Sequence, residues 1–79
     1  MWYVYILEST IRHFVYVGST NDLERRVNQH NSGEVMSTKP YKPLKLKAYI
    51  AVENQTKAID LEQYLKSGSG RAFLQKRIL

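Results

Sequence analysis

Two short runs of aromatic and β-branched residues constrain this sequence more than any other feature. Residues 2–7, WYVYIL, and residues 14–18, FVYVG, both favour β-strands, and the polar stretch between them predicts a hairpin. Pairing Tyr5 with Tyr16 and Leu7 with Phe14 leaves residues 9–12 for the loop, a common hairpin length.

Both faces of this hairpin are apolar, because successive side chains of a strand point to opposite sides. One face holds the tyrosines: Tyr3, Tyr5, Leu7, Phe14, Tyr16 and Gly18. The other holds Trp2, Val4, Ile6, Val15 and Val17. We therefore expect helices to cover much of the sheet.

The remaining sequence predicts one more strand and three helices. The first helix begins after Asn21, which with Glu24 forms a capping box, and ends near residues 29–31, before Gly33. A long loop over residues 31–43 leads to a strand over residues 44–52, LKLKAYIAV. Its alternation places these residues on one face: Leu44, Leu46, Ala48, Ile50 and Val52.

The C-terminal third contains two helices separated by SGSG at residues 67–70. The second helix has an apolar stripe of Ala58, Leu61 and Leu65, and a last short helix has Ser69 as its expected cap. The sequence thus predicts one α+β domain over residues 1–79: a small three-stranded sheet, a hairpin plus a third strand, flanked by helices in the order β-β-α-β-α-α.

Composition narrows the function classes. Lysine and arginine total 12 against 7 acidic residues, a net charge of +5 that favours a polyanionic partner. Cysteine is absent, which excludes disulfides and thiolate metal sites. No segment approaches the roughly 20 apolar residues that span a bilayer, and the N-terminus lacks the features of a secretory signal. We expect a soluble cytoplasmic protein with no membrane partner.

Both main helices carry ionisable groups beside their apolar stripes. Arg26 and His30 lie next to the stripe of the first helix, and Glu62 lies between Leu61 and Leu65 on the second. Unpaired buried charge is costly, so we expect these groups to face each other, a cleft or a ligand. Tyr5 and Tyr16 add two phenols.

This set of groups suits cleavage of a phosphodiester bond. A single carboxylate can hold one Mg²⁺, whose other ligands are waters and phosphate oxygens. Arginine stabilises charge that develops on a phosphate, and a histidine can relay a proton or position a water. A tyrosine can act as a general base where a nearby cation lowers its pKa from the usual value of about 10.

The segments WYVYIL, YVG, ERR, QHN and AIDLEQYLK, in this order, resemble the GIY-YIG nuclease family over almost the whole chain. Small stand-alone members are the most similar; the nuclease module of the bacterial excision-repair incision subunit and the homing endonucleases are related. The first triplet departs from the family, since Tyr3 replaces its glycine and fills space beside the site.

The resemblance implies one-metal hydrolysis of DNA with Mg²⁺ or Mn²⁺. The implied catalytic residues are Tyr5, Tyr16, Arg26, His30 and Glu62, with Glu62 as the metal ligand and Gly18 as the turn glycine. Tyr5 is favoured as the general base, with Tyr16 supporting it.

Each of these residues also has a simpler structural interpretation. The tyrosines can be cross-strand packing, and Arg26 can extend its stem along the core. His30 can favour a helix C-terminus, and Glu62 can pair with Lys66. These alternatives explain the residues one by one but not their convergence.

Basic residues outside this set are candidates for contacts with DNA. They are Lys39, Lys42 and Lys45, with Lys66 and Arg71 flanking a Gly-rich helix start that could bind phosphate. The alternatives are a solvated face and an ordinary helix break.

Two functions remain open after this. The leading one is a metal-dependent endonuclease acting on damaged or structured DNA rather than on a specific sequence, with RNA as a further possible partner. The other is a nucleic-acid-binding module with little turnover; a structural or interaction domain ranks third. The oligomeric state is not predicted.

Overall fold

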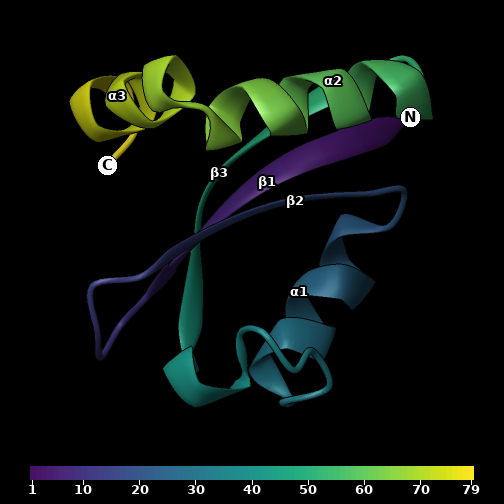
Figure 1. The fold of residues 1–79 in the computed structure, drawn as a ribbon. Helices are drawn as coiled ribbons and strands as arrows, with labels where there is room; N and C mark the ends of the chain where they lie inside the picture. Colours follow the sequence, from purple (N-terminus) through teal and green to yellow (C-terminus); the bar gives the residue numbers. More distant parts are fainter.

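The computed structural model describes all 79 residues and has the predicted element order. The elements are β1 (Trp2–Ser9), β2 (Val15–Thr20), α1 (Leu23–Asn31), β3 (Leu44–Val52), α2 (Gln55–Lys66) and α3 (Gly68–Arg77), with a short 3-10 turn over Lys39–Tyr41. The three strands form one antiparallel sheet in the order β2-β1-β3, so β2 is an edge strand (Figure 1). The predicted α+β fold is confirmed.

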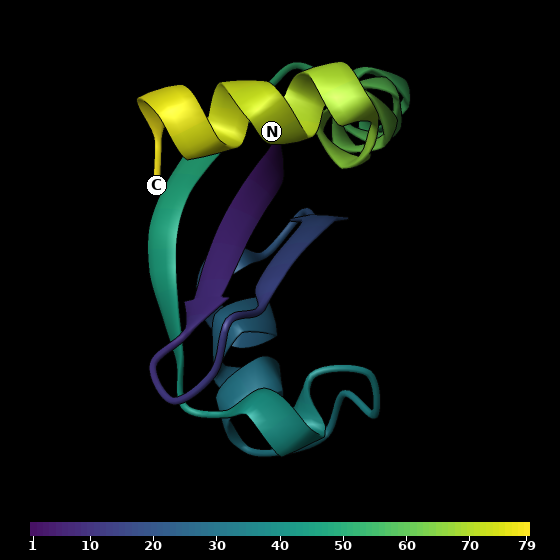
Figure 2. The same ribbon diagram turned by 60° about the vertical axis from the view of Figure 1, so that its left-hand side comes forward.

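Helices cover both faces of the sheet. Helices α2 and α3 lie on one side and α1 on the other (Figures 1 and 2). The core under α2 and α3 consists of Val4, Ile6, Val17, Ala58, Leu65 and Leu74. The core on the α1 side is built on Tyr5, Leu7 and Leu44, with Phe14, Tyr16, Leu23 and Val27 packed against it. The predicted division of the hairpin into two apolar faces is therefore confirmed.

The hairpin register differs from the prediction by two residues. Tyr5 pairs with Gly18 rather than with Tyr16, and Leu7 pairs with Tyr16 rather than with Phe14. The Ser9 amide donates to the Phe14 carbonyl at 3.0 Å, so the loop is residues 10–13. A shift of two leaves every side chain on its predicted face, which is why the cores form as expected.

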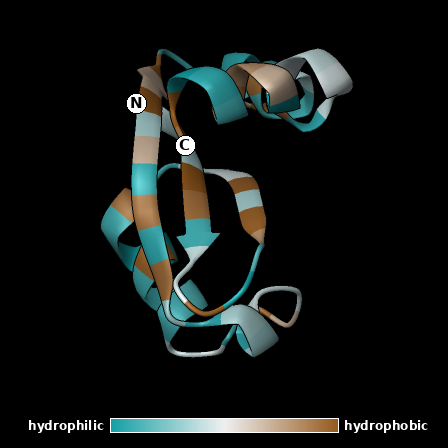
Figure 3. Ribbon diagram, turned by 90° about the vertical axis from the view of Figure 1, so that its left-hand side faces the viewer, coloured by the Kyte–Doolittle hydropathy of each residue, from teal (hydrophilic) through white to brown (hydrophobic).

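A β-bulge in β3 corrects a second expectation. Ile6 pairs with Ala48 but Leu7 pairs with Leu46, so Lys47 is the extra residue. Because an extra residue inverts the side-chain alternation, Leu46 packs in the α1-side core while Ala48 packs in the α2–α3 core. The apolar residues of this strand therefore do not share one face. Figure 3 shows hydrophobic residues concentrated on the strands.

Two helix caps differ from those expected. Asp22, not Asn21, caps α1 by accepting a hydrogen bond from the Arg25 amide. Ser67, not Ser69, caps α3 through the Gly70 amide, and Ser67 also ends α2. The break between these helices is thus a single residue. None of the helices combines the length and apolar character needed to cross a membrane.

Candidate active site

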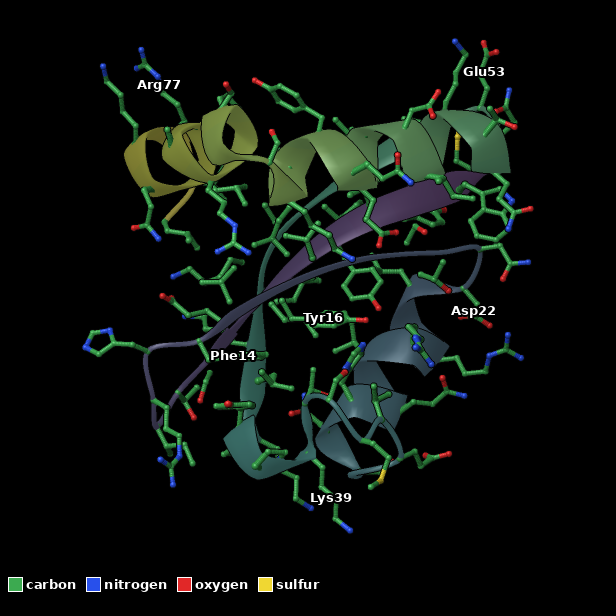
Figure 4. All side chains as sticks on the ribbon, viewed as in Figure 1. Phe14, Tyr16, Asp22, Lys39, Glu53 and Arg77 are labelled. Carbon is green, nitrogen blue, oxygen red and sulfur yellow. The ribbon has the colours of Figure 1, made fainter.

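The candidate site lies at the edge of the sheet, where β2 passes between α1 and α2. Tyr5 comes from β1, Tyr16 from β2, Arg26 and His30 from α1, and Glu62 from α2. Figure 4 shows Tyr16 in the space between α2 and α1. Arg26 and Glu62 thus reach the site from opposite faces of the sheet.

Gly18 makes room for the Tyr5 hydroxyl. These two residues are cross-strand partners, and a Cβ added at Gly18 would lie 2.4 Å from Tyr5 Oη and 2.9 Å from Tyr16 Cε2. No side chain fits there without moving one of the phenols. Glycine is needed at this position for close approach, because its backbone is the surface on which Tyr5 rests.

A buried chain of hydrogen bonds leads inward from Tyr5. Tyr5 Oη lies 2.9 Å from His30 Nε2, and His30 Nδ1 lies 2.8 Å from Thr38 Oγ1. Tyr5 is 1% exposed, and His30 and Thr38 are fully buried. Thr38 Oγ1 in turn lies 3.4 Å from the carbonyl oxygen of Val35. His30 is therefore held at both ring nitrogens.

Aromatic contacts hold the same group together. The Tyr16 and His30 ring centroids are 4.9 Å apart, and those of Tyr5 and Tyr16 are 6.2 Å apart. Tyr3, which replaces the first glycine of the family triplet, packs edge-on against Tyr49 of β3 at 5.9 Å.

Arg26 is the cation beside the two phenols. Burial raises the pKa of Tyr5, and the guanidinium of Arg26 opposes this rise. The same contact with Tyr5 raises the pKa of Arg26. Arg26 Nη1 also donates to Gln29 Oε1 at 3.0 Å, which restrains the guanidinium from the other side. At neutral pH the pair is thus a neutral phenol and a charged guanidinium.

His30 is neutral at physiological pH. Burial, followed by repulsion from Arg26, lowers the pKa of His30 to about 4. A neutral imidazole has one donor nitrogen and one acceptor nitrogen. It therefore accepts a hydrogen bond at one ring nitrogen and donates one at the other.

Glu62 is held by two hydrogen bonds. Ser19 donates to Oε1 at 2.7 Å, and Lys66 donates to Oε2 at 2.6 Å. Lys66 Nζ also lies 5.9 Å from the centre of the Tyr16 ring, which links Glu62 to the phenols. The expected pairing of Glu62 with Lys66 is thus present, and it coexists with the approach of Glu62 to the site.

The donor set fits a single hydrated divalent ion. The molecule has no group of three or more His, Cys, Asp or Glu side chains able to hold a metal, so an ion here would have one carboxylate ligand. Mg²⁺ accepts such an arrangement, with waters and substrate oxygens as its other ligands. The Lys66 side chain that pairs with Glu62 is 47% exposed.

The basic residues predicted to contact DNA lie in two places. Lys39 and Lys42 gather beside Gly33, just past the end of α1. Lys66 and Arg71 flank the junction of α2 and α3, where Arg71 Nε donates to the Lys66 carbonyl. Lys45 lies on β3 opposite Glu8. Lys66 is the one of these that contacts the candidate site directly.

Two residues of the site were not predicted from the sequence. Ser19 orients Glu62, and Thr38 binds the inner nitrogen of His30. Neither has a periodic or motif signal, because each is a small hydroxyl residue in a polar stretch.

Comparison with known proteins gives the family. The model of the GIY-YIG catalytic domain matches residues 1–77. The chain belongs to the GIY-YIG family. This assignment confirms the resemblance and implies a nuclease-like function, and GIY-YIG nucleases generally use divalent metals.

Small GIY-YIG proteins of the UPF0213 group are similar to this chain. A UPF0213 protein from Vibrio campbellii is 41% identical over 82% of the chain and 62% of its own length. One from Clostridium perfringens is 39% identical over 84% of the chain and 71% of its own length. The chain thus spans about two thirds of these relatives.

A solved structure supports the same fold. The solution NMR structure of a UPF0213 protein from Bacillus halodurans superimposes with a TM-score of 0.57 at 32% identity. The alignment covers 96% of this chain and 84% of that one.

Proposed function

We propose that this chain, as a single domain over residues 1–79, is a metal-dependent endonuclease that hydrolyses DNA phosphodiester bonds. The observation that carries the proposal is the contact of the Tyr5 hydroxyl with His30 Nε2 beside the Arg26 guanidinium. The cations of the site are of the kind that bind phosphates, which position a backbone without reading bases. We therefore propose that DNA structure, rather than sequence, selects the target.

Tyr5 acts as the general base through a double proton transfer. Its raised pKa keeps the phenol protonated at neutral pH, so it can take a proton from water only if its own proton leaves at the same time. His30 Nε2, 2.9 Å away, is the acceptor for that proton. The water then attacks phosphorus as hydroxide, and the bond to the leaving oxygen breaks.

Arg26 stabilises the charge that develops on the phosphate oxygens. Its guanidinium is restrained by Gln29 and lies beside both phenols, so little reorganisation is needed when the substrate binds. Tyr16 packs on His30 and borders the space that the phosphate enters. We assign Tyr16 a supporting role, in which it positions the attacking water.

Glu62 is the proposed metal ligand, with Ser19 fixing its orientation. Mg²⁺ or Mn²⁺ held by Glu62 would supply charge stabilisation at the phosphate and at the leaving oxygen. The Ser19 hydroxyl of β2 donates to Oε1 at 2.7 Å and restrains the carboxylate. Lys66 neutralises Glu62 before substrate binds and, once it swings aside, provides a cation for a neighbouring phosphate.

The bond between Lys66 and Glu62 also favours a second candidate function. An ammonium already placed on the single carboxylate at 2.6 Å competes with a metal ion. If Lys66 keeps the metal ion away from Glu62, the domain would bind DNA or RNA through its cations without cleaving it.

Nicking of supercoiled plasmid DNA distinguishes the two. We expect the protein with Mg²⁺ or Mn²⁺ to nick the plasmid, and Tyr5→Phe, Arg26→Ala and Glu62→Ala each to lower the rate by about 100-fold or more. Tyr64→Phe is the matched control, since Tyr64 is half exposed on the outer side of α2. Nicking that survives Arg26→Ala and Glu62→Ala would contradict the proposal. Salt-dependent binding without nicking would establish the second function.

Binding of Mn²⁺ tests the role of Glu62 as a metal ligand without requiring turnover. Electron paramagnetic resonance of the free ion measures this binding. We expect Glu62→Gln to abolish binding. Lys66→Met should tighten it about two- to fivefold, because an exposed ion pair contributes up to about 1 kcal/mol. Lys57→Met removes the same charge from α2 elsewhere and should change little. Unaltered binding by Glu62→Gln would rule out this metal site.

A further inference from the structure

Thr38 lies behind the site, in the turn that follows α1. Its side chain is fully buried, although it belongs to a surface loop. Its amide donates to the Val35 carbonyl at 3.2 Å, and its carbonyl accepts from the Tyr41 amide at 2.9 Å. The backbone of the turn therefore fixes where the Thr38 hydroxyl lies. That hydroxyl contacts His30 Nδ1 at 2.8 Å.

The direction of the hydrogen bonds along this chain follows from the groups at its two ends. At the inner end, the Val35 carbonyl can only accept, and the Thr38 hydroxyl is placed to donate to it. At the outer end, the Arg26 guanidinium beside Tyr5 can only donate. Donors therefore point inward throughout: Tyr5 O–H to His30 Nε2, and His30 Nδ1–H to Thr38 Oγ1.

The opposite direction would leave a buried donor without a partner. If Thr38 donated to Nδ1, then Nε2 would carry the proton and donate to Tyr5 Oη. His30 is the hydrogen-bond partner of Tyr5 Oη and the Tyr5 residue as a whole is 1% exposed, so the phenol proton would then have no acceptor within the protein. A buried unsatisfied donor is strongly disfavoured, whereas the inward direction satisfies every group.

We infer that Thr38 is a positioning residue: its hydroxyl holds His30 in the Nδ1-protonated tautomer and so leaves Nε2 free to receive the proton of Tyr5. The catalytic part of this inference depends on the proposed nuclease function, whereas the tautomer does not. Thr38 touches neither substrate nor metal and acts only through His30.

The tautomer can be measured without any activity. Long-range ¹H–¹⁵N correlation spectra at pH 7 distinguish protonated from unprotonated ring nitrogens. The chain has 2 histidines, so His13→Gln assigns the signals of His30. We expect the wild type to show a protonated Nδ1 and an unprotonated Nε2. Thr38→Val, which keeps the shape but removes the hydroxyl, should shift protonation toward Nε2, and Thr38→Ser should restore the wild-type pattern.

Two spectroscopic results would overturn the inference: a wild-type His30 protonated at Nε2, or a Thr38→Val spectrum with an unchanged tautomer. The wild-type spectrum decides the first of these even where Thr38→Val fails to fold. In the nicking assay we expect Thr38→Val to lower kcat about tenfold or more with KM nearly unchanged, and Thr38→Ser to recover the rate. Full activity of a Thr38→Val protein with an altered tautomer would refute the catalytic role.

A wild type that shows the Nδ1-protonated tautomer but never nicks DNA would refute the proposed function and the catalytic role of Thr38. The structural role of Thr38 in setting the tautomer would be upheld by the same data.

Discussion

At the residue level, His30 combines complete burial with hydrogen bonds at both ring nitrogens and a guanidinium nearby. Each of these conditions favours a neutral ring in the resting protein. Protonation would place a second donor against the Tyr5 hydroxyl and a second charge beside Arg26. His30 is thus a structural element of the fold as well as a proposed catalytic residue.

The protonation of His30 links stability to pH. Unfolded, His30 titrates near pH 6.5, whereas the folded state holds its pKa at about 4, so the unfolded chain binds more protons between these values. The contribution to the free energy of unfolding is complete above about pH 7. It falls as the pH drops toward 4, by at most about 3 kcal/mol.

Urea unfolding at pH 7.5, 6 and 5 measures this loss. His30→Gln should flatten the pH dependence, whereas His13→Gln, in the hairpin loop, should retain it. An equal pH dependence in His30→Gln and the wild type would show that the loss has another source.

At the level of elements, the junction of α2 and α3 positions the last turns of α2, which carry Glu62 and Lys66. Ser67 is the only residue between the two helices. Three residues later, in the first turn of α3, Gly70 is buried against α2: an added Cβ would lie 2.0 Å from the Tyr64 carbonyl oxygen and 2.4 Å from Leu65 Cα. Both are backbone atoms, so no side-chain rotation can relieve the overlap.

Gly70→Ala should therefore lower the free energy of unfolding by about 2–3 kcal/mol. Gly68→Ala is the matched control in the same turn, because an added Cβ there meets nothing within 4 Å. That change should leave stability unchanged or raise it slightly, since alanine favours helix more than glycine does. Thermal unfolding followed by circular dichroism compares the two. Equal melting temperatures would mean that α3 can shift away from α2 without cost.

The elements and the two faces of the hairpin were predictable from the sequence, whereas the register and the faces of β3 were not. Alternation in WYVYIL and FVYVG identifies the faces, but a shift of two residues preserves them, so it cannot distinguish Gly18 from Tyr16 as the partner of Tyr5. The bulge at Lys47 interrupts an alternation of apolar and polar residues that looks regular in the sequence. Asn21 and Asp22 are both suitable helix caps, so the sequence does not distinguish between them.

The site residues also differ in whether the sequence could predict them. Arg26, His30 and Glu62 stand out because polar groups beside an apolar stripe are unusual. Thr38 has no such signal, because its role depends on a turn that places it 2.8 Å from His30. Only the folded chain shows this contact.

For the whole molecule, four of the candidate DNA-binding cations fall into two groups, one beyond the end of α1 and one at the α2–α3 junction, where Lys66 contacts the site. Lys39 and Lys42 lie beyond the end of α1, and Lys66 and Arg71 lie at the α2–α3 junction. Figure 4 shows Lys39 and Tyr16 well separated. A nucleic-acid backbone that crosses the edge of the sheet could contact both groups.

The salt dependence of DNA binding tests this path. Removing one cation that binds a phosphate should reduce the slope of log K against log salt by about 0.9 on duplex DNA. We expect Lys39→Gln with Lys42→Gln, and Lys66→Gln with Arg71→Gln, each to reduce it by about 1–2. Lys57→Gln with Lys76→Gln removes equal charge elsewhere and should leave the slope unaltered. Identical slopes in all three double variants would indicate attraction by net charge alone.

The position of the site at β2 has a consequence for the reaction products. Arg26 and Glu62 approach from opposite faces of the sheet. Their separation therefore depends on how α1 and α2 pack against the sheet and not on a flexible loop. The candidate residues make up one site, and a single site cleaves one strand at a time. Under the proposed activity each encounter leaves a nick, and a double-strand break takes a second encounter with the complementary strand or a second molecule.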